Sequence, residues 1–195
     1  MKYTTKIAGM YEDCPEVAEY MELRKRVFVD RLSWDIPTWE QYEFDQYDTA
    51  KTVYVLALRD SKVVAGGRLI RTDSQMPGSI YGKNPYTYMI ADACDGLLDG
   101  MPTNLCDEEP PRDPKVWEFS RIISSKHDGA AVREVFYAAN NYICDQGGVR
   151  GVFIGSPALM RMCKMSGFDP KPMGPIVSTQ DAGRFLAFQC NSLAS

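Results

Sequence analysis

The sequence predicts a single domain of the α/β or α+β class, in which helices flank a mixed sheet. The chain has 195 residues, 45% hydrophobic and 25% charged, which is typical of one globular domain with one core. Runs of β type are separated by segments with helical spacing, an order that favours a mixed sheet. No internal repeat or interdomain linker divides the chain, so we treat residues 1–195 as one domain.

The first two expected elements are an edge strand at residues 3–9 and an amphipathic helix at residues 15–32. Apolar residues recur at intervals of three and four along the second segment, which is the spacing of one helix face. Arg24 lies inside this apolar stripe, so its guanidinium points toward the body of the protein. Because an unpaired buried guanidinium is costly, we expect a carboxylate partner for it, supplied by the protein or by a ligand.

Residues 33–51 form an irregular segment that is rich in acidic and aromatic side chains. Glu43, Asp45 and Asp48 crowd together between Tyr and Phe residues. A run of charge is usually a solvated surface, but aromatic rings need cover, and acids interleaved with them can line a site for a cation. The segment is therefore a candidate binding site.

The middle of the chain predicts a hairpin followed by long loops. Residues 52–58 and 63–71 are of β type, and the polar RDSK between them has the length of a hairpin connection. Residues 72–87 contain Gly, Pro, Asn and Ser, and residues 101–115 are Pro-rich and acidic, so both read as loops. Residues 88–100 are expected to hold a short helix.

Residues 116–124 (VWEFSRIIS) have the composition of a buried strand. Strict alternation places Glu118 on one face and Arg121 on the other, beside Trp117 and Phe119. A carboxylate and a guanidinium on an otherwise buried strand must each be paired or take part in chemistry.

The last third of the chain is expected to alternate between helix and strand. Residues 130–146 have helical spacing, and residues 151–155 and 185–190 are of β type. Ser156 is expected to cap a further helix, with proline in its first position, and Gly167 is expected to end it.

Charge and motif content exclude several classes of function. The net charge of −4 argues against a general nucleic-acid binder, and no apolar run reaches the roughly 20 residues of a membrane span. The start of the chain lacks the apolar core of a secretory signal, and six cysteines without a CxxC pair fit reduced thiols, so we expect a cytoplasmic location. The single histidine, His127, is expected to be solvated, and no ligand spacing predicts a metal site.

Four blocks of sequence occur in order: LRKRVFVDRLSWD, EFDQYD, GGRLIRT and VWEFSRI. Together they resemble the acyl-homoserine lactone synthase family, the autoinducer synthases of bacterial quorum sensing. The resemblance is closest over residues 20–125 and continues more weakly through residues 151–170. The residues that match the family's functional positions are Arg24, Phe28, Trp34, Glu43, Asp45, Asp48, Arg68, Glu118 and Arg121.

The resemblance implies a fold like that of the GNAT acetyltransferases, a twisted mixed sheet whose central strands splay to admit a pantetheine arm. It also implies an acyltransferase that uses no metal or cofactor. The amine of S-adenosylmethionine takes an acyl group from acyl carrier protein or acyl-CoA, and lactone closure then expels methylthioadenosine. The family often has Pro-Thr where this chain has Arg71-Thr72, and Phe where it has Cys94. These departures leave the length and type of the acyl chain undetermined. The sequence also does not determine the oligomeric state.

The chemistry suggests roles for the matched residues. Glu118 is a candidate general base toward the α-amine, or alternatively a carboxylate that only holds an arginine in place. The acids at 43–48 suit the cationic groups of S-adenosylmethionine, an arginine suits its carboxylate, and Trp34 can pack on the sulfonium or the adenine. Ser120 begins the strand edge whose backbone N–H groups are expected to stabilise the thioester oxygen.

The acyl tail requires an apolar pocket. The candidates for lining it follow the strand at 151–155, although for each single methionine an ordinary core position is the favoured interpretation: Leu159, Met160, Met162, Met165 and Phe168. Ser156 lies about where the family has a hydroxyl residue linked to preference for 3-oxo chains.

A carrier protein is acidic, so its docking surface should be basic. Residues 112–173 hold nine basic and six acidic side chains, whereas residues 1–60 hold eight basic and twelve acidic. The candidates for docking are Lys126, Arg133, Arg150 and Lys164.

Two other functions remain compatible with the sequence. A plain GNAT N-acyltransferase acting on another amine would hold the coenzyme A pyrophosphate with a Q/R-x-x-G-x-G/A loop, which KHDGAA at residues 126–131 matches in part. That function does not explain Arg24 together with the acids at 43–48. A non-catalytic sensor would bind S-adenosylmethionine or an acyl carrier and perform no reaction.

Overall fold

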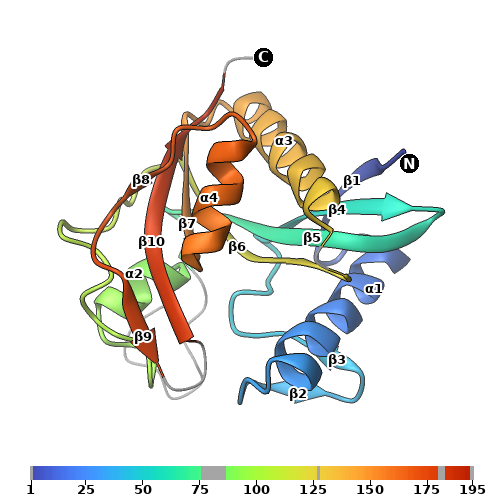
Figure 1. Cartoon of the computed structure of the whole chain (residues 1–195), viewed down its shortest axis with the longest axis horizontal. Helices are drawn as coiled ribbons and strands as arrows, with labels where there is room; N and C mark the ends of the chain where they lie inside the picture. The colour runs from blue at the N-terminus through green and yellow to red at the C-terminus, as the bar shows by residue number, and fades with distance from the viewer. Residues whose placement is uncertain (1, 76–86, 127, 180–182, 194–195) are drawn as a thin grey trace.

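The computed structural model describes residues 2–75, 87–126, 128–179 and 183–193. Its centre is an eight-stranded mixed sheet in the order β1-β4-β5-β6-β7-β10-β8, with β9 pairing to the start of β10 (Figure 1). This confirms the predicted fold class. Within the described residues, no helix is long and apolar enough to cross a membrane. His127 and most of the predicted loop at 72–87 lie outside the described residues.

The N-terminal half of the sheet is antiparallel, as the hairpin pattern predicts. β1 (Thr4–Gly9) pairs with β4 (Val53–Arg59), and β4 pairs with β5 (Lys62–Arg71). Alternate residues of β4 face opposite layers, because successive side chains of a strand point to opposite faces. Val55 packs in the layer of helix α3 (Gly129–Asp145), whereas Tyr54 packs in the layer of helix α1 (Pro15–Arg24).

The predicted helix at 15–32 forms α1 (Pro15–Arg24), which begins at the expected proline and continues as the π-helical segment η1 (Lys25–Arg31). The apolar stripe is buried against β5 and the first strands. Arg24, inside that stripe, has no exposed surface. Residues after the helix are irregular, as predicted, apart from the two-residue strands β2 (Thr38–Trp39) and β3 (Tyr42–Glu43).

β6 (Val116–Ser124) departs from the strict alternation that its sequence predicts. Arg121 has a φ of 54°, and the register against β5 shifts there, which are the marks of a β-bulge. Beyond the bulge the faces exchange, so Ile122 packs in the same core as Phe119. The prediction that Arg121 and Glu118 lie on opposite faces is therefore wrong, since Arg121 turns toward the acidic segment with Asp45.

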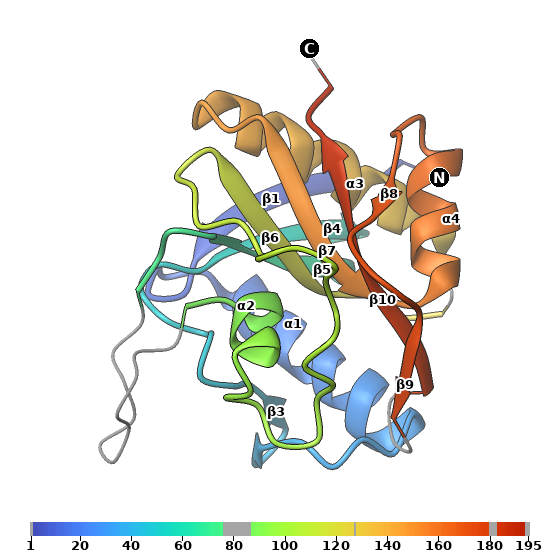
Figure 2. The same cartoon turned by 90° about the vertical axis from the view of Figure 1, so that its left-hand side faces the viewer.

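The two central strands splay apart. β6 and β7 (Arg150–Gly155) run parallel and pair only from Val116 to Phe119 on one side and from Arg150 to Phe153 on the other. Beyond this point β6 continues along β5, and β7 continues along β10 (Gly183–Asn191). The resulting opening, which we call the fork, confirms the splayed central strands that the family resemblance implies (Figure 2).

Two helices cover the face of the sheet opposite α1. α3 (Gly129–Asp145) and α4 (Pro157–Met165) agree closely with the predicted helices, and Ser156 caps α4 by accepting a hydrogen bond from a backbone N–H. The short strands β8 (Lys171–Pro172) and β9 (Val177–Thr179) were not predicted, because two or three residues carry no periodic signal.

The predicted short helix is α2 (Met89–Cys94), which lies beside β6 on the face of the sheet that carries Glu118 (Figure 2).

Gly67 on β5 permits the close approach of β6. A Cβ at this position would lie 2.3 Å from the ring of Phe119, so no larger residue fits without displacing that ring.

Candidate active site

Three arginines and three acids form one buried ion-pair cluster between α1, the 33–51 segment and the sheet. Arg24 forms a bidentate pair with Asp48, with Nη1 to Oδ1 at 2.8 Å and Nη2 to Oδ2 at 2.9 Å, and its Nε donates to Glu43. The partner expected for Arg24 is therefore supplied by the protein. Tyr54 donates a further hydrogen bond to Asp48 at 2.8 Å.

The second half of the ion-pair cluster joins the acidic segment to the central strands. Arg68 on β5 contacts Asp45 at 2.5 Å and Asp48 at 3.1 Å, and Arg121 on β6 contacts Asp45 at 2.8 Å and Glu43 at 3.4 Å. Burial alone would raise the pKa of Asp48, but Arg68 and Arg24 hold it well below its usual range. Asp45 and Asp48 are thus ionised and neutralised by arginines, so their direct role is to position those arginines.

Aromatic rings flank the ion-pair cluster, as the sequence predicted. Phe28 and Trp34 stack with ring centroids 4.7 Å apart, and the guanidinium of Arg121 lies 5.3 Å from the Phe28 ring. The guanidinium of Arg68 lies 5.4 Å from the ring of Tyr47. Trp34 is half-buried, so its outer face is available to a planar or cationic group.

Glu118 is a fully buried carboxylate with one oxygen left without a hydrogen-bond partner among the described residues. Its Oε2 accepts a hydrogen bond of 2.9 Å from the backbone N–H of Ile90 in α2. Burial raises its pKa to about 7, against the lowering effects of the Ile90 bond and of Arg68. Nη2 of Arg68 is likewise buried without a hydrogen-bond partner in the described chain.

The sequence did not reveal the network that supports Glu118. Asp92 of α2 is fully buried and accepts hydrogen bonds from the hydroxyl of Tyr47 at 2.7 Å and from the N–H and hydroxyl of Thr87. It therefore ties the start of α2, which carries the Ile90 N–H, to the ring beside Arg68. A buried Asp in the apolar run YMIADAC was the available signal.

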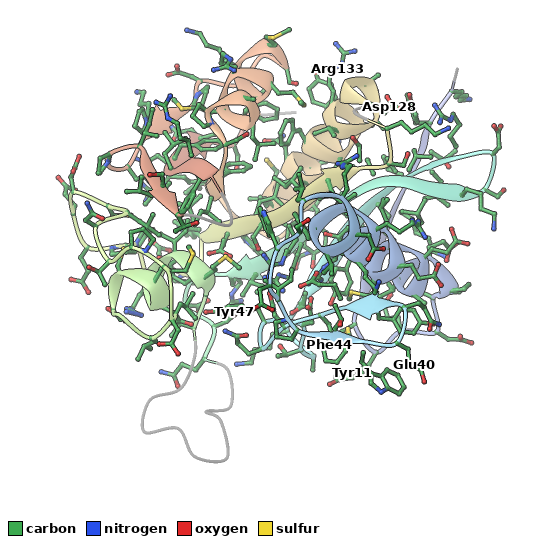
Figure 3. All side chains as sticks on the ribbon, turned by 60° about the horizontal axis from the view of Figure 1, so that its bottom comes forward. Tyr11, Glu40, Phe44, Tyr47, Asp128 and Arg133 are labelled. Atoms are coloured by element: carbon green, nitrogen blue, oxygen red, sulfur yellow. The ribbon has the colours of Figure 1, made fainter. Side chains whose placement is uncertain are left out.

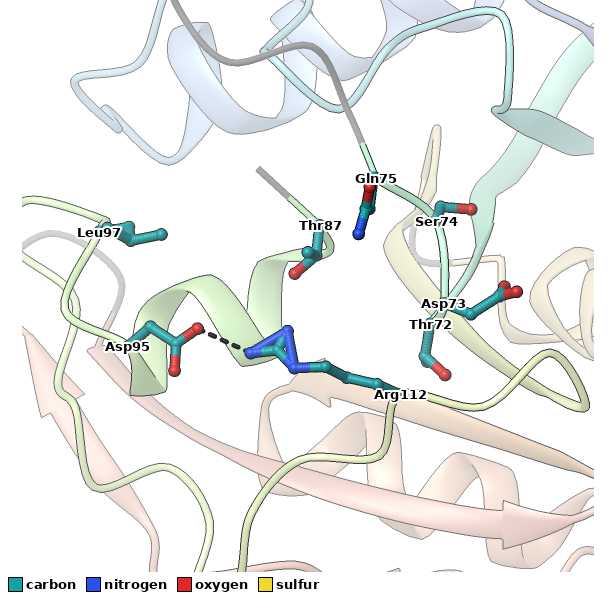
Figure 4. A pocket seen from close by; sticks show the side chains of 8 residues that line it. All are labelled: Thr72, Asp73, Ser74, Gln75, Thr87, Asp95, Leu97 and Arg112. Atoms are coloured by element: carbon teal, nitrogen blue, oxygen red, sulfur yellow. Dashed lines mark hydrogen bonds and ion pairs between the residues drawn. The ribbon is translucent and has the colours of Figure 1, made fainter. Parts of the chain in front are cut away.

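A polar pocket lies on the same side of the molecule as α2 (Figure 4). An ion pair between Arg112 and Asp95, at 2.7 Å, crosses it. None of the arginines and acids of the ion-pair cluster lines this pocket, but Thr87, which donates to Asp92, does.

A small apolar cavity of about 20 Å³ lies on the other face of the sheet, under α3 and α4. Phe119 and Phe153, the last paired residues before the fork, line it together with Phe136 and Phe168. Of the side chains predicted to line an acyl pocket, Phe168 lines this cavity. Met165 is 84% exposed and does not line it.

The other predicted pocket residues lie nearby. Met160 and Met162 are half-buried and pack against the same core without lining the cavity, and so does Leu159. The hydroxyl of Ser156 is exposed and accepts the N–H of Leu159 at 3.3 Å, so it serves as a helix cap. Ser120 lies close to Arg68, whose Nε points to its hydroxyl at 3.4 Å.

The sequence matches the autoinducer synthase family over residues 12–188. The chain belongs to the autoinducer synthase family. It is 26% identical over 163 residues to an acyl-homoserine-lactone synthase of Pseudomonas aeruginosa, which covers 82% of this chain and 71% of the relative. It is 30% identical over 141 residues to the isovaleryl-homoserine lactone synthase of Bradyrhizobium diazoefficiens, covering 71% of this chain and 55% of that enzyme. The autoinducer synthase is accordingly an acyltransferase.

Solved structures agree with this family assignment. TofI in a ternary complex with an inhibitor and MTA is 25% identical, with a TM-score of 0.75, and the match covers 98% of this chain and 91% of TofI. BjaI, described as a CoA-dependent acyl-homoserine lactone synthase with SAM and isopentyl-CoA, shares the fold at 24% identity and a TM-score of 0.72, covering 98% and 84%. A Lactobacillus plantarum protein assigned as an N-acetyltransferase shares the fold at a TM-score of 0.61, covering 98% and 99%, which confirms the GNAT-like architecture.

The basic residues predicted to dock a carrier protein do not form one cluster in the autoinducer synthase. Lys126 and Arg133 are exposed near the start of α3, and Arg133 projects from the surface there (Figure 3). Lys164 is exposed near the end of α4. Arg150 is half-buried and donates to Gln189 at 2.9 Å, at the end of β7 away from the fork.

The start of α3 bears on the alternative function of a plain GNAT N-acyltransferase that uses coenzyme A. Asp128 caps this helix, and its carboxylate accepts the N–H of Ala131 at 3.1 Å while Tyr3 and Arg59 also contact it. A pyrophosphate held by a GNAT loop would need these N–H groups. An anionic carboxylate already occupies this position, which disfavours coenzyme A binding at the KHDGAA segment.

Proposed function

We propose that this autoinducer synthase transfers an acyl group from a thioester to the amine of S-adenosylmethionine and then closes the lactone, releasing methylthioadenosine. The observation that carries the proposal is a pair of buried polar atoms beside the fork, Oε1 of Glu118 and Nη2 of Arg68, which have no hydrogen-bond partner among the residues that the structure describes. One is an acceptor for a proton, and the other is a donor for an anion. The acyl-homoserine lactone formed is a quorum-sensing signal.

The first step is amide formation, and it requires a neutral amine. A free α-amino group has a pKa of about 8, so an adjacent base with a pKa near 7 can remove its proton at little cost. Glu118 takes that proton on Oε1, and the amine nitrogen attacks the thioester carbon. The C–S bond breaks as the amide C–N bond forms, and the thiolate leaves and is protonated.

The thioester oxygen gains negative charge during this attack. The edge of β6 that faces β7 has no strand partner beyond Phe119 in the described sheet, so backbone N–H groups at the fork are available to that oxygen. This is the role predicted for the strand edge that begins at Ser120. The pantetheine arm of the donor then lies between the two central strands.

The second step is lactone closure, which is mainly a matter of positioning. The carboxylate oxygen of the acylated substrate attacks the carbon that bears the sulfonium, and the C–S bond breaks to release neutral methylthioadenosine. Because the sulfonium is already a good leaving group, we propose that the reaction needs no metal or cofactor. Arg68, with its free Nη2, is placed to hold the substrate carboxylate.

The remaining cluster residues position these groups. Arg24, Glu43 and Asp48 lock the acidic segment onto α1, and Asp45 links Arg68 to Arg121. Phe28 and Trp34 are placed to pack on the sulfonium or the adenine of S-adenosylmethionine. We propose that these residues act through orientation, since each charge is already paired within the protein.

For the acyl donor, we propose an acyl carrier protein in preference to acyl-CoA, with the cytoplasm as the site of action. The Asp128 cap at α3 supports this choice because its carboxylate already accepts one of the first N–H groups of the helix and would repel a pyrophosphate there. Lys126 and Arg133, exposed on either side of that cap, are available to an acidic carrier. Equal rates with the same acyl group on carrier protein and on coenzyme A would contradict this choice.

The function is tested by expressing the chain in a bacterium that makes no such signal and analysing the culture extract by mass spectrometry. We expect an acyl-homoserine lactone from the wild type and none from Glu118→Gln at equal soluble expression. An acylated amine without a lactone ring would favour the plain GNAT acyltransferase instead. Binding of S-adenosylmethionine without any product from loaded donors would favour a sensor.

A further inference from the structure

The fork connects the two faces of the sheet. On one face lie Glu118 and Arg68, where the amine and the thioester must meet under the proposed function. On the other face lies the cavity, which Phe119 and Phe153 line where the parallel strands separate and which extends from there to Asn140, Asn191 and Ser192. A thioester carbon held beside Glu118 would therefore direct its acyl tail through the fork into this cavity.

Phenylalanine rings line the cavity next to the fork. Phe136 of α3 lies at their centre, with its ring centroid 6.3 Å from each of Phe119, Phe153 and Phe168 in edge-to-face geometry. Phe119 and Phe153 are themselves 5.8 Å apart. These are the separations of closely packed rings, so an acyl tail that enters between them must displace at least one ring.

The cavity that remains has a volume of about 20 Å³, enough for a single water-sized group. Ligand pockets are usually formed before the ligand arrives. A long acyl tail would have to displace several buried rings. Overpacking a closely packed core raises its free energy by more than the burial of one further methylene lowers it, since one buried methylene improves affinity only about fourfold.

We infer that this autoinducer synthase prefers a short acyl group, such as butanoyl, to a long one, and that Phe136 is the residue that sets the limit, because each further methylene requires more displacement of the packed rings. The inference rests on the proposed function, because it concerns the acyl tail of that reaction. It adds the size class of the substrate and a specificity-determining residue, neither of which follows from family membership.

The test compares butanoyl and octanoyl donors with the purified full chain, each acyl group being supplied both on carrier protein and on coenzyme A. Lactone product is measured by mass spectrometry. We expect the wild type to use butanoyl donors with a kcat/KM at least about tenfold higher than that for octanoyl donors. Equal use of the two chain lengths, or a preference for octanoyl, would overturn the inference while leaving the proposed function intact.

The specificity-determining residue is tested with Phe136→Leu, which opens space at the centre of the ring cluster. We expect the preference for butanoyl to fall by about tenfold or more because octanoyl turnover rises. The matched control is Phe188→Leu. Phe188 is equally buried and stacks on Phe153 at 4.8 Å but does not line the cavity, so the preference should stay unchanged.

If Phe136→Leu does not fold, as judged by thermal melting, Phe168→Leu provides the same test at the edge of the ring cluster. A folded variant of either kind with the wild-type preference would overturn the assignment. If neither donor gives a lactone with the wild type, although S-adenosylmethionine binds, the proposed function itself fails. That outcome is distinct from a lactone made only from octanoyl donors.

Discussion

Substituting Glu118 by glutamine should produce opposite effects on activity and stability. In the folded protein, burial raises the pKa of Glu118 from its ordinary 4.5 to about 7, while Ile90, Arg68 and Ser120 lower it and Asp45 adds to the rise. That displacement corresponds to about 3 kcal/mol of free energy. Glu118 is ready to accept a proton because its ionised form is poorly stabilised.

The direction in which pH changes the contribution of Glu118 to stability follows from proton binding in the folded and unfolded states. In the unfolded chain Glu118 ionises above about pH 4.5, but in the folded chain it stays protonated up to about pH 7. Between these values the folded state holds the extra proton, so this residue's contribution to stability falls as pH rises. Above pH 7 both states are ionised, and the folded state carries the whole penalty of about 3 kcal/mol.

Glutamine does not titrate, so Glu118→Gln removes the pH-dependent contribution of this residue to the free energy of unfolding. We expect the free energy of unfolding of the variant, relative to wild type, to rise by about 2 to 3 kcal/mol between pH 5 and pH 8. Other titrating groups are common to both proteins and cancel in the difference. Urea unfolding at each pH measures it.

The same variant should lose about 10²- to 10⁴-fold in kcat, the usual contribution of a general base. The wild-type kcat/KM should rise with pH through about 7, and that limb should be missing from the variant. A variant that is both active and less stable at pH 8 would refute the reasoning and leave Glu118 as a structural partner of α2.

Three further predictions concern other parts of the site. Arg24→Ala should lower the free energy of unfolding by about 3–5 kcal/mol in urea titrations, since it leaves buried acids uncompensated; a loss below about 1 kcal/mol would contradict the buried ion pair. Asp92→Ala should cost about 1–3 kcal/mol and lower kcat at unchanged KM, with Asp92→Asn restoring most of both, because its acceptor role positions α2. Charge reversal by Lys126→Glu with Arg133→Glu should raise KM several-fold for an acyl carrier but not for acyl-CoA, whereas Lys164→Glu measures whether the second surface takes part.

Periodicity was sufficient to predict the elements that are long and one-sided. The 15–32 helix, the hairpin and the capped helix after Ser156 each carry a local signal that tertiary contacts do not override. The burial of Arg24 followed from the same periodicity, because a charged side chain in an apolar stripe cannot avoid the core. Its need for a carboxylate partner was therefore predictable, although which acid supplied it was not.

The features that sequence reasoning missed depend on single backbone irregularities or on distant contacts. The alternation of side chains between two faces holds only for a strand without a bulge. The positive φ of Arg121 introduces a bulge in β6, and no glycine in the sequence marks it. Tyr47 and Asp92 meet across 45 positions of sequence, so their hydrogen bond has no local signature. Met165 follows the helical pattern of α4, but that helix buries only Cys163 completely.

The most direct test of the account is a balance of products from the purified chain. S-adenosylmethionine and a butanoyl carrier protein are incubated with enzyme, and free thiol, methylthioadenosine and butanoyl-homoserine lactone are quantified together. The account predicts that the three appear in equal amounts in the wild type and that all three fall together in Glu118→Gln. Thiol release with an acylated amine but no methylthioadenosine would contradict the lactone-forming reaction.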